Sequence, residues 1–178
     1  MRAAVPAGER VPMPFGLGMT GLEGAGNGGF MDLELVRRWI SGWAGMERVL
    51  SFSVDHYSAV PENGTIGPAG VSEICRKKDI LGNVAVEQEV RFVLNFVLLQ
   101  NGDDDVLAMD NAQWLLNLQA WIQEQGLWGL VPVFGNFQTV RAEDGRLQEV
   151  SPEGTAVYSM ELTFHFTRVY EVMEYGKN

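Results

Sequence analysis

Few side chains in this sequence are of the kinds that carry out catalysis or hold a metal ion. The chain has one cysteine, Cys75, and two histidines, His56 and His165. Cys75 precedes the basic run Arg76–Lys78, and neighbouring positive charge can stabilise a thiolate. No sequence signature of a catalytic cysteine surrounds it, so we interpret Cys75 as a structural thiol. A single cysteine also excludes an internal disulfide and any zinc site built from several cysteines.

Three acidic or amide residues have the spacing that opens a calcium-binding loop. Asn101, Asp103 and Asp105 are two residues apart, as the first ligands of an EF-hand are. That loop also needs a glycine at its sixth position and a glutamate at its twelfth, where this chain has Val106 and Ala112. The segment is therefore interpreted as a turn that caps a following helix.

The histidines and the glycine-rich stretches do not form recognisable sites either. His165 lies on the polar side of a predicted strand and His56 follows another, so we interpret both as structural. Residues 16–29 and 64–70 lack the preceding strand and the Lys-Ser or Lys-Thr pair of a phosphate-binding loop. Neither Gly-x-Ser-x-Gly nor His-Glu-x-x-His occurs. The sequence predicts no enzymatic activity, no cofactor and no metal ion.

Composition and charge narrow the class of protein further. The 178 residues are 46% hydrophobic and 20% charged, which is typical of one globular domain. Thirteen basic against 23 acidic side chains give a net charge of −10. This excess of negative charge disfavours non-specific binding to nucleic acid and to anionic membrane surfaces. No apolar run is long enough to predict a transmembrane helix.

Residues 1–30 differ in composition from the rest of the chain. They contain 8 of the 21 glycines and 3 of the 7 prolines, and their charges cancel. We predict a flexible leader here, followed by a single domain over residues 31–178, because such a segment buries too little apolar surface to offset its ordering entropy. Two explanations stay open. The leader is either an arm that orders on assembly, or upstream sequence translated from a start codon placed too early.

The N-terminal half of the domain predicts one helix and mainly short strands. Apolar residues recur at helical spacing over residues 32–44, with Asp32 as the N-cap. Alternation over residues 50–54 predicts a strand. Residues 58–72 hold two prolines and three glycines, which predicts a loop, and a short strand is predicted around Ile74.

The middle of the chain gives the strongest pattern. A turn over residues 79–83 precedes a long strand over 86–99. One face of this strand is polar and solvent-exposed at its start, and both faces are apolar at its end. An acidic turn over residues 100–105 then leads into a helix over 106–125, which we expect Gly126 to end.

The C-terminal third is predicted to consist of strands. Residues 137–142 and 147–150 are expected to pair through an Asp144-Gly145 hairpin turn, and a second turn at 151–154 precedes a strand over 158–166. The element order predicts an α+β fold: an antiparallel or mixed β-sheet with two amphipathic helices packed on one face and a β-rich C-terminal third.

The second predicted helix has more apolar surface than one sheet can cover. Beside its main apolar stripe, Trp114, Leu118 and Trp121 widen the arc to about half the circumference of the helix. Large aromatic residues are enriched at the centres of protein interfaces. We therefore predict that these three residues belong to a subunit interface.

This arrangement resembles the tail terminator (tail completion) proteins of Gram-positive prophages. The resemblance rests on the helix 33–43 with its following strand, the charged turn and long strand over residues 76–96, the second helix with Trp114 and Gln125, and the C-terminal strands over 147–170. It covers about residues 31–172, carries no catalytic signature, and leaves the leader outside.

The resemblance implies a structural protein of the virion that is assembled in the bacterial cytoplasm. Such proteins form a ring, commonly hexameric, at the head-proximal end of the tail tube. The ring stops tube polymerisation and joins the tail to the head-closure or connector protein, and DNA could pass through its lumen without specific binding. Two alternatives remain: another head–tail connector or tail-tube component, and an acidic adaptor or inhibitor domain that is not from a phage.

Overall fold

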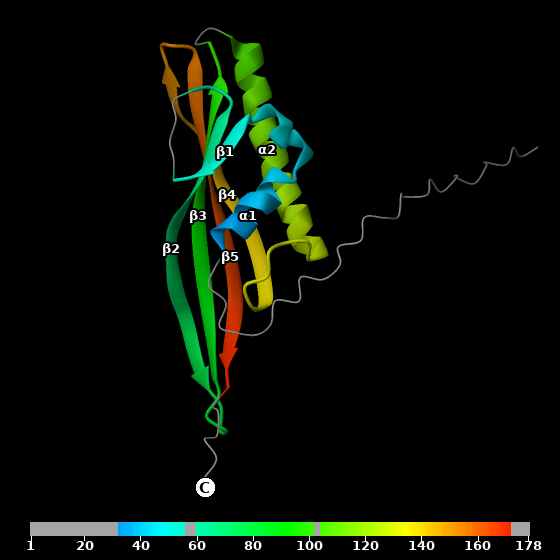
Figure 1. Cartoon of the computed structure of the whole chain (residues 1–178), viewed down its shortest axis with the longest axis vertical. Coiled ribbons are helices and arrows are strands. Elements are labelled where there is room, and N and C mark those ends of the chain that lie inside the picture. Colours follow the sequence, from blue (N-terminus) through cyan, green and yellow to red (C-terminus); the bar gives the residue numbers. More distant parts are fainter. Residues whose placement is uncertain (1–31, 56–59, 102–103, 172–178) are drawn as a thin grey trace, which may run out of the picture.

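The computed structural model describes residues 32–55, 60–101 and 104–171, which form one mixed β-sheet with its helices on one face (Figure 1). The strand order is β1-β2-β3-β5-β4. The strands are β1 Ser51–Val54, β2 Asn63–Lys78, β3 Val84–Leu99, β4 Asn136–Ser151 and β5 Thr155–Tyr170. This architecture confirms the predicted α+β fold. The predicted leader, residues 1–30, lies outside the described residues.

The first helix, α1 (Leu33–Ser41), begins where its capping residue predicts. The Asp32 carboxylate accepts hydrogen bonds from the backbone N–H groups of Glu34 and Leu35, at 3.0 and 3.4 Å. The helix ends three residues before the predicted Ala44. A 3-10 turn, η1 (Ala44–Arg48), continues the chain beside α2 (Asp105–Trp128), so that both short elements pack on the helical side of the sheet.

Strand β2 corrects the loop predicted over residues 58–72. β1 pairs parallel to its first residues, and β3 pairs antiparallel along its whole length. Its glycines serve close packing and bulges instead of turns: a Cβ on Gly64 would lie 2.8 Å from the Phe96 ring and 2.9 Å from that of Phe52. The register shifts between Pro68 and Gly70, where Gly70 has φ +132°. The loop prediction was wrong for residues 63–72, because it treated every glycine and proline as a turn residue; residues 60–62 do form a turn, and residues 58–59 lie outside the described part of the chain.

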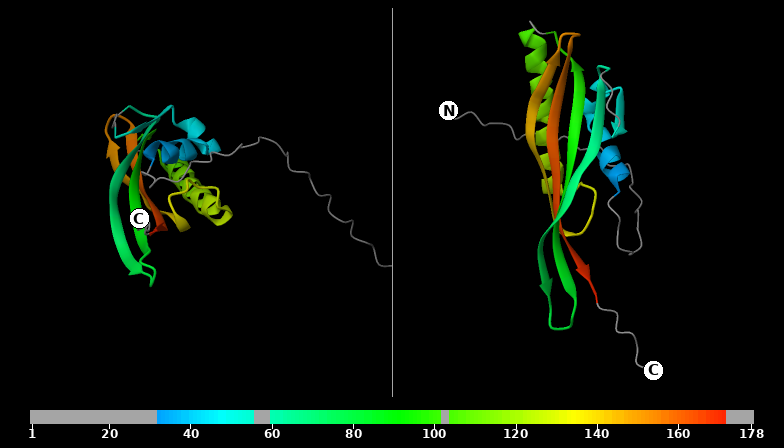
Figure 2. Two further views of the ribbon diagram at one scale, coloured as in Figure 1. Left: turned by 60° about the horizontal axis from the view of Figure 1, so that its bottom comes forward. Right: turned by 90° about the vertical axis from the view of Figure 1, so that its left-hand side faces the viewer.

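The two long central strands confirm the strongest predicted element. β3 and β5 pair without interruption from Val84–Tyr170 to Leu99–Thr155. The turn predicted over residues 79–83 joins β2 to β3, and the Asp79 N–H donates to the Asn83 carbonyl at 3.0 Å. In both views of Figure 2 these strands extend as a long twisted ribbon, and the β2–β3 turn lies beyond the helices.

Strand β4 corrects the predicted hairpin at Asp144 and Gly145. The chain does not turn back there but continues as one strand, and two residues bulge opposite one residue of β5. Asp144 has φ +54°, the left-handed conformation found both in type I′ hairpin turns and in one class of β-bulge. The hairpin predicted at this point lies instead at residues 151–154, where the second turn was expected.

Helix α2 also runs past its predicted end. Gly126 lies inside the helix, and a Cβ there would meet Val140 Cγ1 of β4 at 2.7 Å. The helix ends at Gly129, which has φ +67° and donates to the Gly126 carbonyl at 3.2 Å. Gly126 therefore allows the helix to approach the sheet closely and does not terminate it.

The core lies between the sheet and the helical layer and includes one buried polar network. The Nδ2 of Asn111, a fully buried residue, donates to the Leu99 carbonyl at 3.0 Å and to Gln100 Oε1 at 3.2 Å. The Tyr158 hydroxyl donates to the same oxygen at 2.7 Å, and an Arg48 guanidinium N–H donates to Asn111 Oδ1. The network thus ties η1, α2 and β5 to the end of β3. Burial raises the pKa of Tyr158 above its ordinary value.

Candidate functional site

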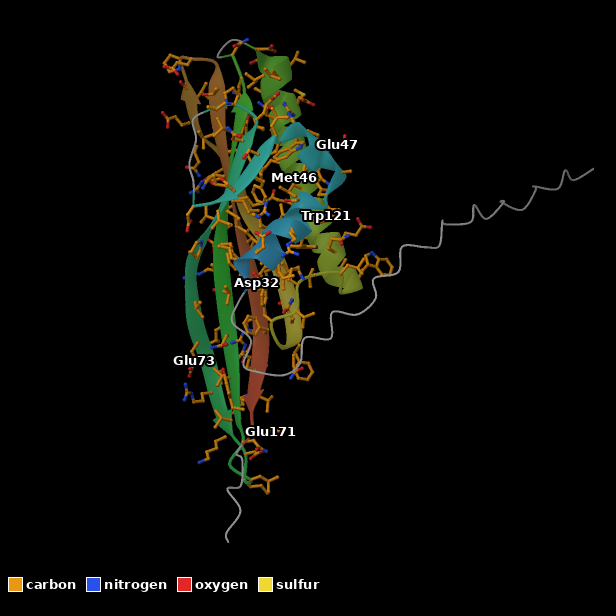
Figure 3. All side chains as sticks on the ribbon, viewed as in Figure 1. Asp32, Met46, Glu47, Glu73, Trp121 and Glu171 are labelled. Atoms are coloured by element: carbon orange, nitrogen blue, oxygen red, sulfur yellow. The ribbon has the colours of Figure 1, made fainter. Side chains whose placement is uncertain are left out.

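Two of the three residues predicted to form a subunit interface lie in the core, and the third is half-buried against it. Leu118 is fully buried, and Trp114 is 8% exposed. The Trp114 indole packs edge-on against Phe96, with ring centroids 4.9 Å apart, and its Nε1 donates to the Gly45 carbonyl at 2.8 Å. Trp121 is half-buried and stacks on Trp39 of α1 at 5.3 Å, which places it between the helices (Figure 3).

The expectation that these side chains are left uncovered was therefore wrong. From the sequence we expected only the sheet to cover them, whereas Trp39 of α1 and Trp43, the residue before η1, supply a second cover. We therefore no longer assign Trp114, Leu118 and Trp121 to an interface with another subunit.

A different face of α2 is apolar and exposed. Met109, Leu116 and Leu127 are 73%, 56% and 86% exposed, and Ala112 and Ala120 are exposed between them. These five residues recur at helical spacing on the side turned away from the sheet, and we call them the outer stripe of α2.

The signal for the outer stripe was present in the sequence. No charged residue occurs from Asn111 to Gln123, so the helix is uncharged on every side over more than three turns. An uncharged surface with large apolar side chains on several sides indicates that a helix is covered on more than one side. From the sequence we expected a wide apolar arc, but its exposed part lies on another side of the helix than Trp114 and Trp121.

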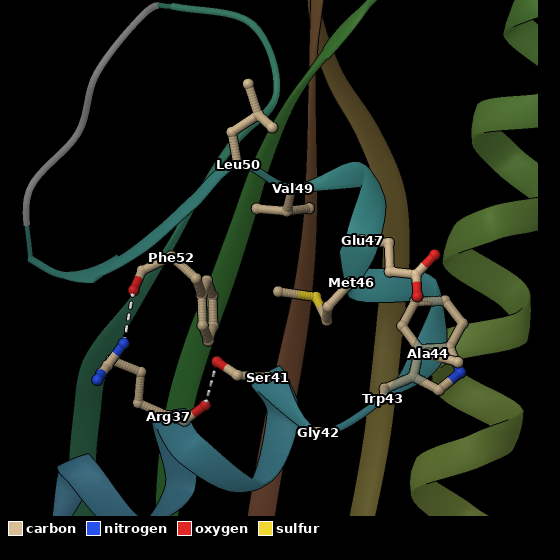
Figure 4. A pocket seen from close by; sticks show the side chains of 10 residues that line it. All are labelled: Arg37, Ser41, Gly42, Trp43, Ala44, Met46, Glu47, Val49, Leu50 and Phe52. Carbon is tan, nitrogen blue, oxygen red and sulfur yellow. Dashed lines mark hydrogen bonds between the residues drawn. The ribbon is translucent and has the colours of Figure 1, made fainter.

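A hollow opens at the opposite side of the helical layer. It has a volume of about 460 Å³ and lies between α1, η1 and β1 (Figure 4). Its apolar lining comes from Trp43, Met46, Val49, Leu50 and Phe52. Figure 4 shows α2 on the far side of η1 from Leu50, so the hollow and α2 lie on opposite sides of η1. We call this hollow the α1–β1 groove.

The charged side chains that line the α1–β1 groove are Arg37 and Glu47. The Arg37 guanidinium forms two bonds of 2.6 Å to the Glu34 carboxylate and one of 3.1 Å to the Phe52 carbonyl. Hydrogen bonding from Arg37, with a smaller contribution from Arg38, lowers the pKa of Glu34 to about 2. The hydrogen bonds of Arg37 thus hold α1 against β1. Because this guanidinium is already bonded, the groove is better suited to apolar side chains than to an anion.

The sheet has one edge on each side that can accept a further strand. β4 forms one edge. At the other, β1 covers only Asn63–Ile66 of β2, so within the described part of the chain Gly67–Lys78 pairs on one side alone. Because the order β2-β3-β5-β4 is antiparallel at every step, β2 and β4 run in opposite directions. Unpaired strand edges are templates for pairing with another chain.

The face of the sheet opposite the helices is polar around its middle but carries Val93, Val97 and Leu99 toward the end of β3. A shallow hollow on it is lined by three carboxylates and two guanidinium groups, together with two threonines and His165. Arg91 lies 3.6 Å from Glu89. Glu143 and Glu161 stand directly opposite each other in β4 and β5, a pairing of like charges that destabilises a sheet. This face therefore retains an unfavourable local charge arrangement in an already acidic chain.

Of the cysteine and the two histidines, the structure describes Cys75 and His165, and each lies beside Glu87. His165 Nε2 lies 3.0 Å from Glu87 Oε1 on the polar face. Cys75 is half-buried on β2 and is paired in register with Glu87. His56 lies outside the described residues. Within the described ranges, no cluster of three or more His, Cys, Asp or Glu residues is placed to hold a metal ion.

No helix in the described part of the chain is long and apolar enough to cross a membrane. In comparisons with known proteins, no protein-family model and no curated protein matches the sequence.

Proposed function

We propose that this protein is a structural component of a phage tail, which forms a ring at the head-proximal end of the tail tube. The ring stops tube polymerisation and joins the tail to the head connector. The proposal starts from the resemblance of residues 31–172 to tail terminator proteins. It is supported by a fold whose candidate functional features are surfaces for assembly instead of a reactive site.

The arrangement of the sheet edges is the observation that carries the proposal. A copy rotated about an axis along the strands brings its β4 beside the β1–β2 edge of its neighbour. Because β2 and β4 run in opposite directions, the new pair is antiparallel and continues the alternation of the sheet. The two edges are different surfaces, so the contact is heterologous, and such contacts close into rings when the rotation permits.

The polar face of the sheet fits the inner wall of such a ring. Helices cover one face of the sheet (Figure 2), and we place that face on the outside of the ring, which sets the charged strand residues on the inside. The hollow on this face has more carboxylates than guanidinium groups. A wall of this composition repels the DNA phosphates and does not retain passing DNA.

Removal of the gene from the prophage, followed by electron microscopy of the induced particles, tests the proposal. We expect tubes longer than normal and not attached to heads, because nothing ends their growth. Wild-type protein supplied from a plasmid restores normal tails. A variant with His56→Asn, His165→Gln and Cys75→Ser serves as the control, since it removes every side chain considered for metal or thiol chemistry and is expected to restore tails equally well.

Two outcomes contradict the proposal. Normal tails joined to heads in the deletion strain would show that the protein does not take part in tail completion. Complete absence of tails would instead identify a tail-tube component, because loss of the tube subunit leaves nothing to terminate.

A further inference from the structure

The apolar groups exposed at the two ends of the helical layer complement each other. Helix α2 lies beside β4, since its Gln119 Nε2 donates to the Ala142 carbonyl at 3.4 Å, and its outer stripe faces away from the sheet, on another side of the helix than Trp114 and Trp121. The α1–β1 groove lies at the β1 edge. One end thus presents a ridge of side chains, and the other presents a hollow of about 460 Å³.

We propose that the outer stripe of α2 seats in the α1–β1 groove of a second copy of this chain. The inference deepens the proposed ring and rests on it: a neighbour that sets its β4 beside the β1–β2 edge also carries its α2 to the groove. Leu116 and Met109 are the principal residues of the ridge, and Leu50 and Phe52 line the receiving wall.

The size of the stripe argues that its cover also contacts the sheet edge. The stripe runs from Met109 to Leu127, about 27 Å of helix, and a face about 10 Å wide gives roughly 270 Å². A stable interface buries about 800 Å² on each partner. The stripe alone is too small, whereas the stripe together with the adjoining β4 edge approaches that area. A second copy offers both complements side by side, the groove for the stripe and the β1–β2 edge for β4.

Charge is compatible with this pairing. The stripe lies on a helix without charged residues from Asn111 to Gln123, and the groove wall around Met46, Val49 and Leu50 is apolar. The Arg37 guanidinium in the groove is already bonded to Glu34, so its contact with an apolar ridge leaves no new unpaired charge. Burying an unpaired ionised group is unfavourable, and Glu47, the other charged residue of the groove lining, is exposed and can stay in contact with water.

Directed disulfide cross-linking tests the contact with purified full-length protein. In a Cys75→Ser background, one tagged copy carries Leu50→Cys and a differently tagged copy carries Leu116→Cys. Both positions are exposed in the monomer, at 78% and 56%, so each variant is expected to fold, and circular dichroism checks this. After mixing and oxidation we expect a cross-linked heterodimer as the main product and no cross-linked dimer from either copy alone.

A matched control replaces the groove cysteine with Ile80→Cys, at a fully exposed apolar position in the β2–β3 turn, away from both surfaces. The heterodimer should then be lost. Equal cross-linking with the Ile80 variant, homodimers from either copy alone, or no product from the Leu50 and Leu116 pair would each overturn the contact.

The cross-link and the tail phenotype separate the two proposals. A specific cross-link from a protein whose deletion leaves tails normal would uphold this contact and refute tail termination. Overlong tails in the deletion strain without the cross-link would support termination and refute this contact.

Discussion

Glu34 holds a small ion-pair cluster at the start of α1. Its carboxylate bonds to Arg37 at 2.6 Å and to Arg38 at 3.2 Å, and it lies in the first turn, where negative charge complements the helix dipole. Arg37 in turn donates to the Phe52 carbonyl, so the cluster connects α1 to β1 at the edge of the α1–β1 groove. The Glu34 side chain thus stabilises the start of α1 and, through Arg37, holds the wall of the groove in place.

The lowered pKa of Glu34 predicts how stability depends on pH. In the folded protein its pKa is about 2, against an ordinary value of 4.5. A depressed carboxyl pKa contributes stability that is present above the ordinary value and is lost as the pH falls through the folded value. The unfolding free energy of the wild type should therefore exceed that of Glu34→Gln above pH 4.5, and the difference should shrink as the pH falls toward 2.

Urea unfolding of both proteins at several pH values between 2 and 7 measures this difference. Added salt at neutral pH should reduce the difference as well, because the ion pairs are partly exposed. A difference that stays constant over the whole pH range would show that Glu34 acts only as a helix-favouring side chain.

At the scale of elements, glycine positions show what could be predicted from the sequence and what could not. The long strand β3, the cap at Asp32 and the turn over residues 79–83 were predictable because hydrophobic period and turn chemistry are local properties. The extents of β2, β4 and α2 were not, because Gly64, Gly126 and Asp144 serve contacts or bulges that exist only after the elements have packed.

The candidate assembly surfaces, too, could be predicted from the sequence only in part. The absence of charge from Asn111 to Gln123 was visible in the sequence and indicated a helix that packs against other elements on more than one side. Which side α1 would cover could not be predicted, because the Trp39–Trp121 and Trp43–Trp114 contacts join segments about 70 to 80 residues apart. The α1–β1 groove forms only when α1, η1 and β1 are in place, so no local pattern in the sequence could predict it.

Gly126 gives a prediction that belongs to this scale. Alanine is the better helix former by about 1 kcal/mol, yet Gly126→Ala should destabilise the fold by roughly 1–3 kcal/mol. Its Cβ would meet the stiff, β-branched Val140 at 2.7 Å. In a Val140→Ala background the same substitution should become neutral or stabilising, because the clashing Cγ1 is gone.

A double-mutant cycle of unfolding free energies measures this coupling. Gly129→Ala is a useful comparison: its cost should come from the left-handed φ of +67°, and it should be the same with or without Val140→Ala. If Gly126→Ala lowered the unfolding free energy equally in both backgrounds, α2 and β4 would have to separate to accept the methyl group.

At the scale of the whole molecule, the proposed ring places the helical layer outside and the polar sheet face inside. Charge on that inner wall then acts on DNA and has little effect on assembly. Replacing Glu143 and Glu161 by Lys removes the pair of opposed carboxylates and makes the wall basic. Because cationic side chains bind DNA phosphates by displacing counterions, we expect phage carrying this double variant to release DNA more slowly, and the delay to weaken as salt is raised.

The matched control changes the same net charge outside the polar hollow and the α1–β1 groove, with Glu124→Lys in α2 and Glu153→Lys in the turn between β4 and β5, both exposed. Tail length should be normal in both double variants, because neither set touches the outer stripe of α2. The kinetics of DNA release, followed by a dye that fluoresces on free DNA, should change for the inner pair alone. Equal release from both variants would place the polar sheet face outside the DNA channel, and the orientation of the subunit in the ring would have to be reversed.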